Sequence, residues 1–122
     1  MIDTETISIQ VMEKHRVYLE RLENFPIKKA AYYQQLKEST NAKSSRALSE
    51  ITGEDWSYIA KVLKTLQLPT PIQTYLSEHK EPAIAKYFHL HRLLELVRLE
   101  EEKLQFQRFR EMLELARENA KL

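Results

Sequence analysis

Basic, hydroxyl and aromatic side chains gather on both sides of Gly53, the only glycine of this 122-residue chain. Lysine and arginine bind phosphate oxygens, and serine and lysine also donate hydrogen bonds to the edges of DNA bases. Residues 28–64 contain seven basic and four acidic side chains, a local charge of +3 in a chain whose net charge is +1. Each of these charges also fits an ordinary solvated helix face. The candidate DNA-contacting residues are Lys43, Arg46, Asp55, Trp56, Ser57, Ala60, Lys61 and Lys64.

These side chains have different expected roles. Ser57 and Lys61 are expected to reach base edges, since lysine suits the hydrogen-bond acceptors of guanine. Trp56 has two possible roles. It contacts DNA at a thymine methyl group or at the sugar-phosphate chain, or it packs on the neighbouring helix. Phosphate contacts, which set the register of a protein on the duplex, are expected from Lys43, Arg46 and Lys64.

Gly53 separates two segments with helical patterns, and glycine adopts a positive φ angle without steric cost. It therefore predicts the sharp turn of a helix-turn-helix. Leu48 before the glycine and Ile59 after it are spaced for contacts between two crossing helices. Asp55 is expected to cap the second helix. Glu54 departs from the pattern, because an apolar residue usually helps to close such a turn.

The rest of the chain also has helical periodicity, and no stretch alternates apolar and polar residues as a strand does. We therefore expect an all-α fold, a multi-helix bundle that contains the helix-turn-helix. Residues 39–42 should form a loop, and Thr70 should cap a helix that starts at Pro71. A first helix over 6–22 is expected to turn inward the side chains of Ile7, Val11, Tyr18 and Leu22. Further helices are expected over 27–37, 44–52, 55–65 and 71–77.

The region from Pro82 to Asn119 contains no clear helix breaker, although a helix of that length is unusual in a small domain. A bend or break is expected near 99–101. The apolar stripe of this region either belongs to the core or forms a dimer surface. Because a small helix-turn-helix protein usually needs two copies to bind tightly, we expect a homodimer. The stripe comprises Leu93, Leu96, Val97, Leu104, Phe106, Phe109, Met112, Leu113 and Leu115.

The composition and the remaining motifs do not indicate an enzyme. Without cysteine, the chain has neither a disulfide framework nor a thiolate metal site. His89 and His91 would point about 200° apart on a helix, so this pair does not chelate one ion. A glycine-rich phosphate loop is absent. No metal, cofactor or small-molecule substrate is expected, and the lack of a signal peptide or an apolar span predicts a cytoplasmic protein that makes no use of a membrane.

Residues 46–69, with their Leu66-x-Leu68-Pro69 ending, resemble the helix-turn-helix of ParB-type partition proteins. The resemblance extends more loosely over 28–112. It implies an all-α, sequence-specific DNA-binding domain whose second motif helix reads the major groove. Asp55 and Trp56 stand where this family often has a serine and a basic residue. The arginine-rich motif of the family's N-terminal CTP-binding domain is absent, so nucleotide hydrolysis is not implied.

Two function hypotheses follow. The first is a sequence-specific, ParB-like DNA-binding protein that acts as a transcription regulator or as an accessory factor of plasmid partition or of a mobile element. The second is an all-helical protein–protein interaction module that does not bind DNA, which the near-neutral net charge and the acidic Glu54 and Asp55 favour. Residues 26–80 are expected to form the DNA-binding core, 1–25 an accessory or dimerisation helix, and 81–122 a C-terminal helical region.

Overall fold

The computed structural model describes the backbone of residues 4–120 and the side chains of residues 8–120. Over this range the fold is all-α, as the sequence predicts, and no strand occurs among the described residues. The elements in chain order are α1 (Thr4–Glu23), α2 (Pro26–Thr40), α3 (Ser45–Thr52), α4 (Trp56–Lys64), the 3-10 helix η1 (Thr65–Gln67), α5 (Thr70–Glu78), α6 (Pro82–Tyr87), α7 (Leu90–Val97) and α8 (Glu102–Ala120).

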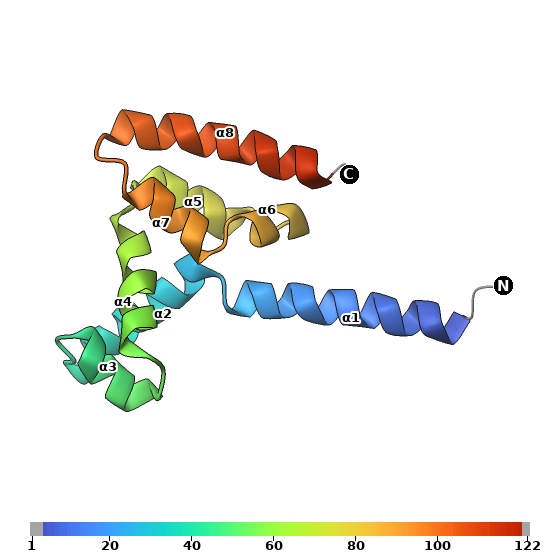
Figure 1. Ribbon diagram of the computed structural model, residues 1–122. Helices are drawn as coiled ribbons and strands as arrows, with labels where there is room; N and C mark the ends of the chain where they lie inside the picture. Colours follow the sequence, from blue (N-terminus) through green and yellow to red (C-terminus); the bar gives the residue numbers. More distant parts are fainter. Residues whose placement is uncertain (1–3, 121–122) are drawn as a thin grey trace.

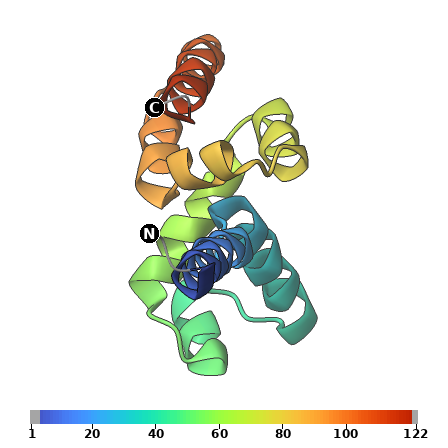
Figure 2. The ribbon, with the colours of Figure 1, turned by 90° about the vertical axis from the view of Figure 1, so that its right-hand side faces the viewer.

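Two hydrophobic clusters hold the helices together. The smaller cluster joins α2, α3 and α4 around Tyr33, Leu48 and Ile59, which are fully buried. The larger cluster joins α5, α6, α7 and α8, and the buried Ile27 brings the start of α2 into it. As a result α3 and α8 lie at opposite ends of the molecule in both ribbon views (Figures 1 and 2).

Helix α1 projects from the body of the molecule (Figure 1). Its C-terminal half packs as expected, since Tyr18 and Leu22 contact the larger cluster and the Tyr18 hydroxyl donates to the carbonyl of Lys80 at 2.5 Å. The expected inward position of Val11 is wrong, because this side chain is 61% exposed where α1 has left the body. The side chain of Ile7 lies outside the described residues.

Two expected helix boundaries are wrong, and hydroxyl side chains are involved in both. The hydroxyls of Ser39 and Thr40 donate to the carbonyl of Leu36 at 3.2 and 2.7 Å. These residues therefore extend α2 instead of forming a loop, and α2 ends at Asn41 with a φ of 58°. Thr70 is itself the first residue of α5, so it does not stand before the helix as a cap, and α5 has no side-chain cap.

The C-terminal region is broken twice. The break expected near 99–101 is confirmed, and the side-chain amide of Gln105 closes it by donating to the carbonyls of Leu96 and Leu99 at 3.1 and 3.0 Å. A second break at Phe88 and His89 was not expected from the sequence. Phe88 is completely buried, so the core contacts of its ring favour the conformation that interrupts the helix.

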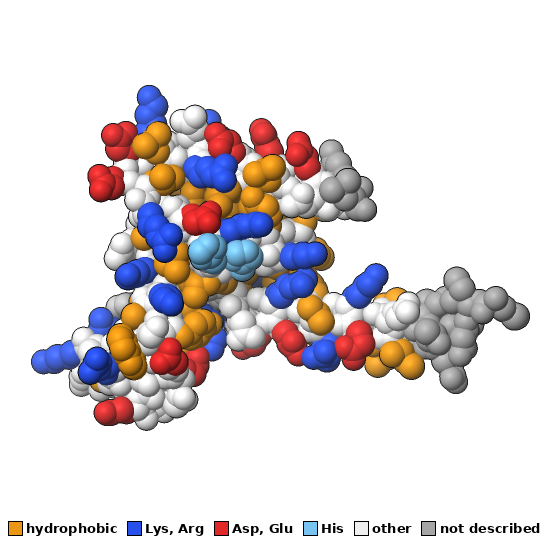
Figure 3. Space-filling view, in the orientation of Figure 1, with side chains coloured by type: hydrophobic (Ala, Val, Ile, Leu, Met, Phe, Trp, Pro, Cys, Tyr) orange, Lys and Arg blue, Asp and Glu red, His pale blue; other side chains and the backbone are white. Residues whose placement is uncertain are grey.

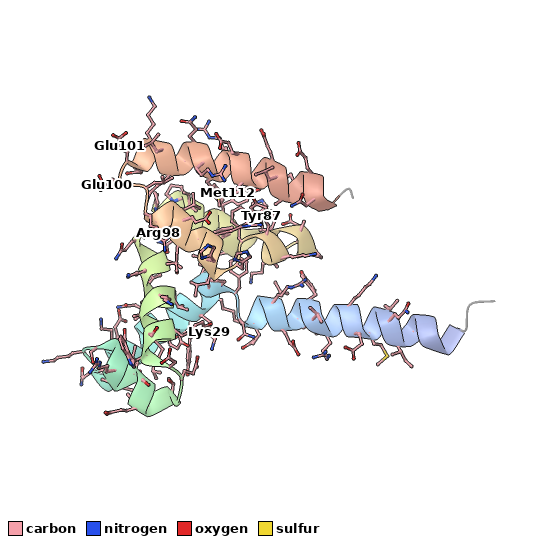
Figure 4. All side chains as sticks on the ribbon, viewed as in Figure 1. Lys29, Tyr87, Arg98, Glu100, Glu101 and Met112 are labelled. Atoms are coloured by element: carbon pink, nitrogen blue, oxygen red, sulfur yellow. The ribbon has the colours of Figure 1, made fainter. Side chains whose placement is uncertain are left out.

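The apolar stripe of α7 and α8 is mainly core. Five of its members have exposed fractions of 9% or less, namely Leu93, Leu96, Phe109, Met112 and Leu113. Met112 lies on α8 and is labelled in Figure 4. Leu104 and Leu115 are 45% and 39% exposed. Because most of the stripe is used inside the chain, it no longer supports a dimer surface, and the homodimer stays a prediction.

Replacing Gly53 by valine should lower the free energy of unfolding by about 1–2 kcal/mol, the usual cost of a left-handed conformation for an L-residue. Gly53 has a φ of 77°. A Cβ atom at this position would meet no atom within 4 Å, so the cost comes from the backbone alone. Gly53→Asn is the matched control and should lose less, because asparagine tolerates a positive φ. Urea unfolding measures the difference, and equal stability of all three proteins would contradict a left-handed turn.

Candidate nucleic-acid interface

Local hydrogen bonds close the turn between α3 and α4. The backbone N–H of Gly53 donates to the carbonyl of Ser49 at 2.8 Å. Asp55 precedes α4, and its carboxylate accepts a hydrogen bond from the backbone N–H of Tyr58 at 3.3 Å. The predictions that Gly53 forms the turn and that Asp55 caps the following helix are both confirmed.

Glu54 connects this turn to α2. Its carboxylate accepts hydrogen bonds from the Tyr33 hydroxyl and from the Lys29 ammonium group, the latter at 3.2 Å. Its backbone carbonyl accepts a hydrogen bond from the Ser49 hydroxyl at 2.6 Å. Lys29 lies on α2 and is labelled in Figure 4. Sequence reasoning did not find this arrangement, because the two partners of the carboxylate stand 21 and 25 residues away.

The partners of Glu54 change its titration. The hydrogen bond from Tyr33 is the largest influence and, together with Lys29, lowers the pKa of the Glu54 carboxyl below its ordinary value despite partial burial. Burial and the neighbouring carboxylate raise the pKa of the Tyr33 hydroxyl. The ionised Glu54 therefore stabilises the fold above the ordinary carboxyl pKa, and this contribution is lost as the pH falls through the lowered value.

Replacing Tyr33 by phenylalanine should lower the free energy of unfolding by about 1 kcal/mol at pH 7, since a hydrogen bond to a half-buried charge is lost. The pKa of Glu54 should rise toward its ordinary value. The stability difference between the two proteins should then shrink as the pH falls through the lowered pKa of Glu54, because the carboxyl becomes protonated in both proteins. Urea unfolding at pH 7 and pH 3 tests this. Tyr32→Phe, at a half-exposed neighbour, is the control, and a pH-independent loss at Tyr33 would contradict the assignment.

Helix α4 has one buried and one exposed face. Ile59 and Val62 are completely buried in the smaller cluster. On the opposite side Lys61 and Lys64 are exposed, and Ser57, one turn before Lys61, is half-buried. Ala60 lies at the edge of this face and is also half-buried. Neither lysine forms an ion pair among the described side chains.

Arg46 and Trp56 are brought together across the turn. The guanidinium carbon of Arg46 lies 4.8 Å from the centre of the Trp56 ring, and the ring is 45% exposed. A guanidinium group stacked on an aromatic ring keeps its in-plane N–H groups free for phosphate oxygens. Lys43 is exposed just before α3, where it lines a shallow hollow together with Lys37 and Asn41 at the end of α2. The candidate residues therefore lie on the outer face of α4 and beside α3, and the stack of Arg46 on Trp56 joins the two helices.

Basic side chains extend beyond α3 and α4. Figure 3 shows Lys and Arg side chains in a band that crosses this face of the molecule toward α7, α6 and α1, with histidines in its middle (Figure 3). Arg98, labelled in Figure 4, ends α7 near the top of α4. Sequence reasoning did not include Arg92 and Arg98, because they stand 28 and 34 positions after Lys64 and share no local pattern with it.

The chain matches no protein-family model, no curated protein and no solved structure. The ParB-type resemblance therefore rests on the residues of this sequence alone.

Two further features bear on the kind of site. Among the described residues, no group of three or more His, Cys, Asp or Glu side chains is placed to hold a metal ion. No described helix is both long and apolar enough to cross a membrane.

Proposed function

We propose that this protein binds double-stranded DNA through α3 and α4, in the manner of a ParB-like helix-turn-helix, and acts as a regulator or as an accessory factor of partition or of a mobile element. The observation that carries the proposal is the outer face of α4. Lys61 and Lys64 are exposed there, opposite the buried Ile59 and Val62, and neither lysine forms an ion pair among the described side chains. A helix held by a rigid turn, with free cations and a hydroxyl on its outer side, suits entry into the major groove.

Each candidate residue has a role in this proposal. Ser57 and Lys61 meet base edges, and Ala60 leaves room for a base or a methyl group beside them. Arg46 contacts a phosphate from its position on the Trp56 ring. Lys43 and Lys64 contact phosphates on either side and hold the register. Asp55 holds the first turn of α4 by capping it and makes no phosphate contact.

An electrophoretic shift with random duplex DNA tests the proposal most directly. With three phosphate contacts, from Lys43, Arg46 and Lys64, the logarithm of the binding constant should fall with the logarithm of salt concentration with a slope of about −3. The shift should be clear at low salt and lost as the salt concentration rises. A binding constant that does not change with salt would contradict phosphate contacts, and no shift at low salt would contradict the proposal as a whole.

A specific observation favours the alternative of a protein–protein interaction module. Ile9, Val11, Met12 and Leu19 on α1 are 49–69% exposed, although apolar side chains in such a group are usually covered. The predicted homodimer would use this exposed apolar surface of α1. A protein that binds no duplex at low salt, while its oligomeric state depends on these α1 residues, would favour the interaction module.

A further inference from the structure

A groove lies between α1, α6, α7 and α8, on elements that take no part in the α3–α4 interface. Its volume is about 670 Å3, within the usual size of small-ligand sites. We call it the basic groove, because its lining includes Arg21, Lys86, His89 and Arg92, and no aspartate or glutamate occurs among the described residues that line it. Its cations Arg21, Lys86 and Arg92 come from three different helices, so the tertiary fold alone brings them together.

The cations of the basic groove have no acidic partner. No carboxylate among the described side chains forms an ion pair with Arg21, Lys86 or Arg92. Arg92 is held in place, since its guanidinium carbon lies 3.7 Å from the centre of the Tyr87 ring and it also donates to the Tyr87 carbonyl at 3.3 Å. Like charges that converge without a counter-ion repel each other, so a bound anion would stabilise this arrangement.

Around His89 the positive charges outweigh the negative one, since Arg92 and His91 affect its pKa more than Glu95 does. Glu95, the acidic residue of α7, lies 3.4 Å from His91 and is not part of the groove lining. Burial, and then the charges of Arg92 and His91, lower the pKa of His89.

We propose that the basic groove binds a phosphate group. Arg21 from α1 and Lys86 from α6 neutralise its charge, and Arg92 presents fixed N–H donors in the geometry that suits phosphate oxygens. Asn119, at the end of α8, offers a further amide. The phosphate comes either from the backbone of a duplex that continues past α4, or from a free phosphate-bearing molecule. The site does not depend on DNA binding by α4.

Titration of the full chain with inorganic phosphate, followed by nuclear magnetic resonance of backbone amides, tests the site. Amides of Lys86, His89 and Arg92 should shift together. Lys86→Glu should weaken binding by about tenfold or more, because it removes one cation and adds an anion. Arg21→Glu, on α1, should do the same. Lys103→Glu is the matched control, since Lys103 is an exposed lysine of α8 outside the groove lining, and it should change the affinity by less than about twofold.

Duplex binding by the same variants separates the two sources of phosphate. If Lys86→Glu, but not Lys103→Glu, also weakens duplex binding and makes the salt slope shallower by about one unit, the phosphate belongs to DNA. If only phosphate binding is lost, the ligand is a free phosphate-bearing molecule. If Lys86→Glu and Arg21→Glu behave like Lys103→Glu toward both probes, the basic groove is not a phosphate site. A protein that binds phosphate here but no duplex would refute the proposed function and leave the groove intact.

Discussion

Replacing Phe88 by alanine should lower the free energy of unfolding by about 3–5 kcal/mol, the usual cost of removing a buried phenyl ring. Phe88 is completely buried, and its ring centre lies 5.4 Å from that of Phe109 and 5.3 Å from that of Tyr87. It stands at the junction of α6 and α7, so the vacated space would adjoin both helices and α8. Urea unfolding of the full chain at neutral pH measures the loss.

Leu104→Ala provides the control for this prediction. Leu104 is an apolar residue of α8 that is 45% exposed, so its truncation should cost less than about 1 kcal/mol. A loss at Phe88 no larger than that at Leu104 would mean that Phe88 does not support the larger cluster. The break between α6 and α7 would then need another explanation.

Replacing Lys61 by alanine should separate sequence recognition from general attachment to DNA. If Lys61 reaches base edges, the variant should lose about 1–3 kcal/mol on a preferred duplex and little on a random one. Arg46→Ala should instead weaken both duplexes by similar factors and make the salt slope shallower, because Arg46 is assigned to a phosphate. Fluorescence polarisation with one preferred and one random duplex measures both effects.

Lys103→Ala is the matched control for the two variants, since it removes a positive charge from an exposed helix position on α8. Its effect on either duplex should be small. If Lys61→Ala weakens both duplexes equally, α4 contacts only the backbone, and the assignment of its outer face to the major groove would be wrong. If Arg46→Ala weakens the preferred duplex alone, the stacked Arg46 and Trp56 would belong to the base-reading surface.

The sequence alone determined the features that depend on neighbouring residues. Gly53 predicted a turn with positive φ, and Asp55 predicted a cap, because both effects act within one helical turn. The burial of Leu48 and Ile59 and the exposure of Lys61 followed from helical periodicity. The candidate interface could therefore be outlined before the structure, although its contact with DNA remains a prediction.

Only the tertiary structure decided the features that depend on distant residues. The carboxylate of Glu54 binds Tyr33 and Lys29 on α2 at the turn where an apolar residue was expected. Because both partners are distant in the sequence, no local rule could predict a carboxylate at this position. At the break between α6 and α7, the ring of Phe88 is buried against Phe109 on α8, a contact that no local pattern in the sequence predicts. The exposed fraction of a side chain also depends on the whole fold. Val11 is an apolar residue of α1, but it is exposed because α1 extends past the body of the molecule.

The basic groove is the clearest case of this limit. Arg21, Lys86 and Arg92 are scattered over 71 positions, and in the sequence each fits an ordinary solvated helix face. They converge only because α1 packs on α6 and because the chain turns before α7. Local sequence determines where a helix begins, ends and turns its apolar side, since hydrogen bonds and caps act over a few residues. Which charged side chains share a surface is decided by packing between elements, and so it emerged only with the fold.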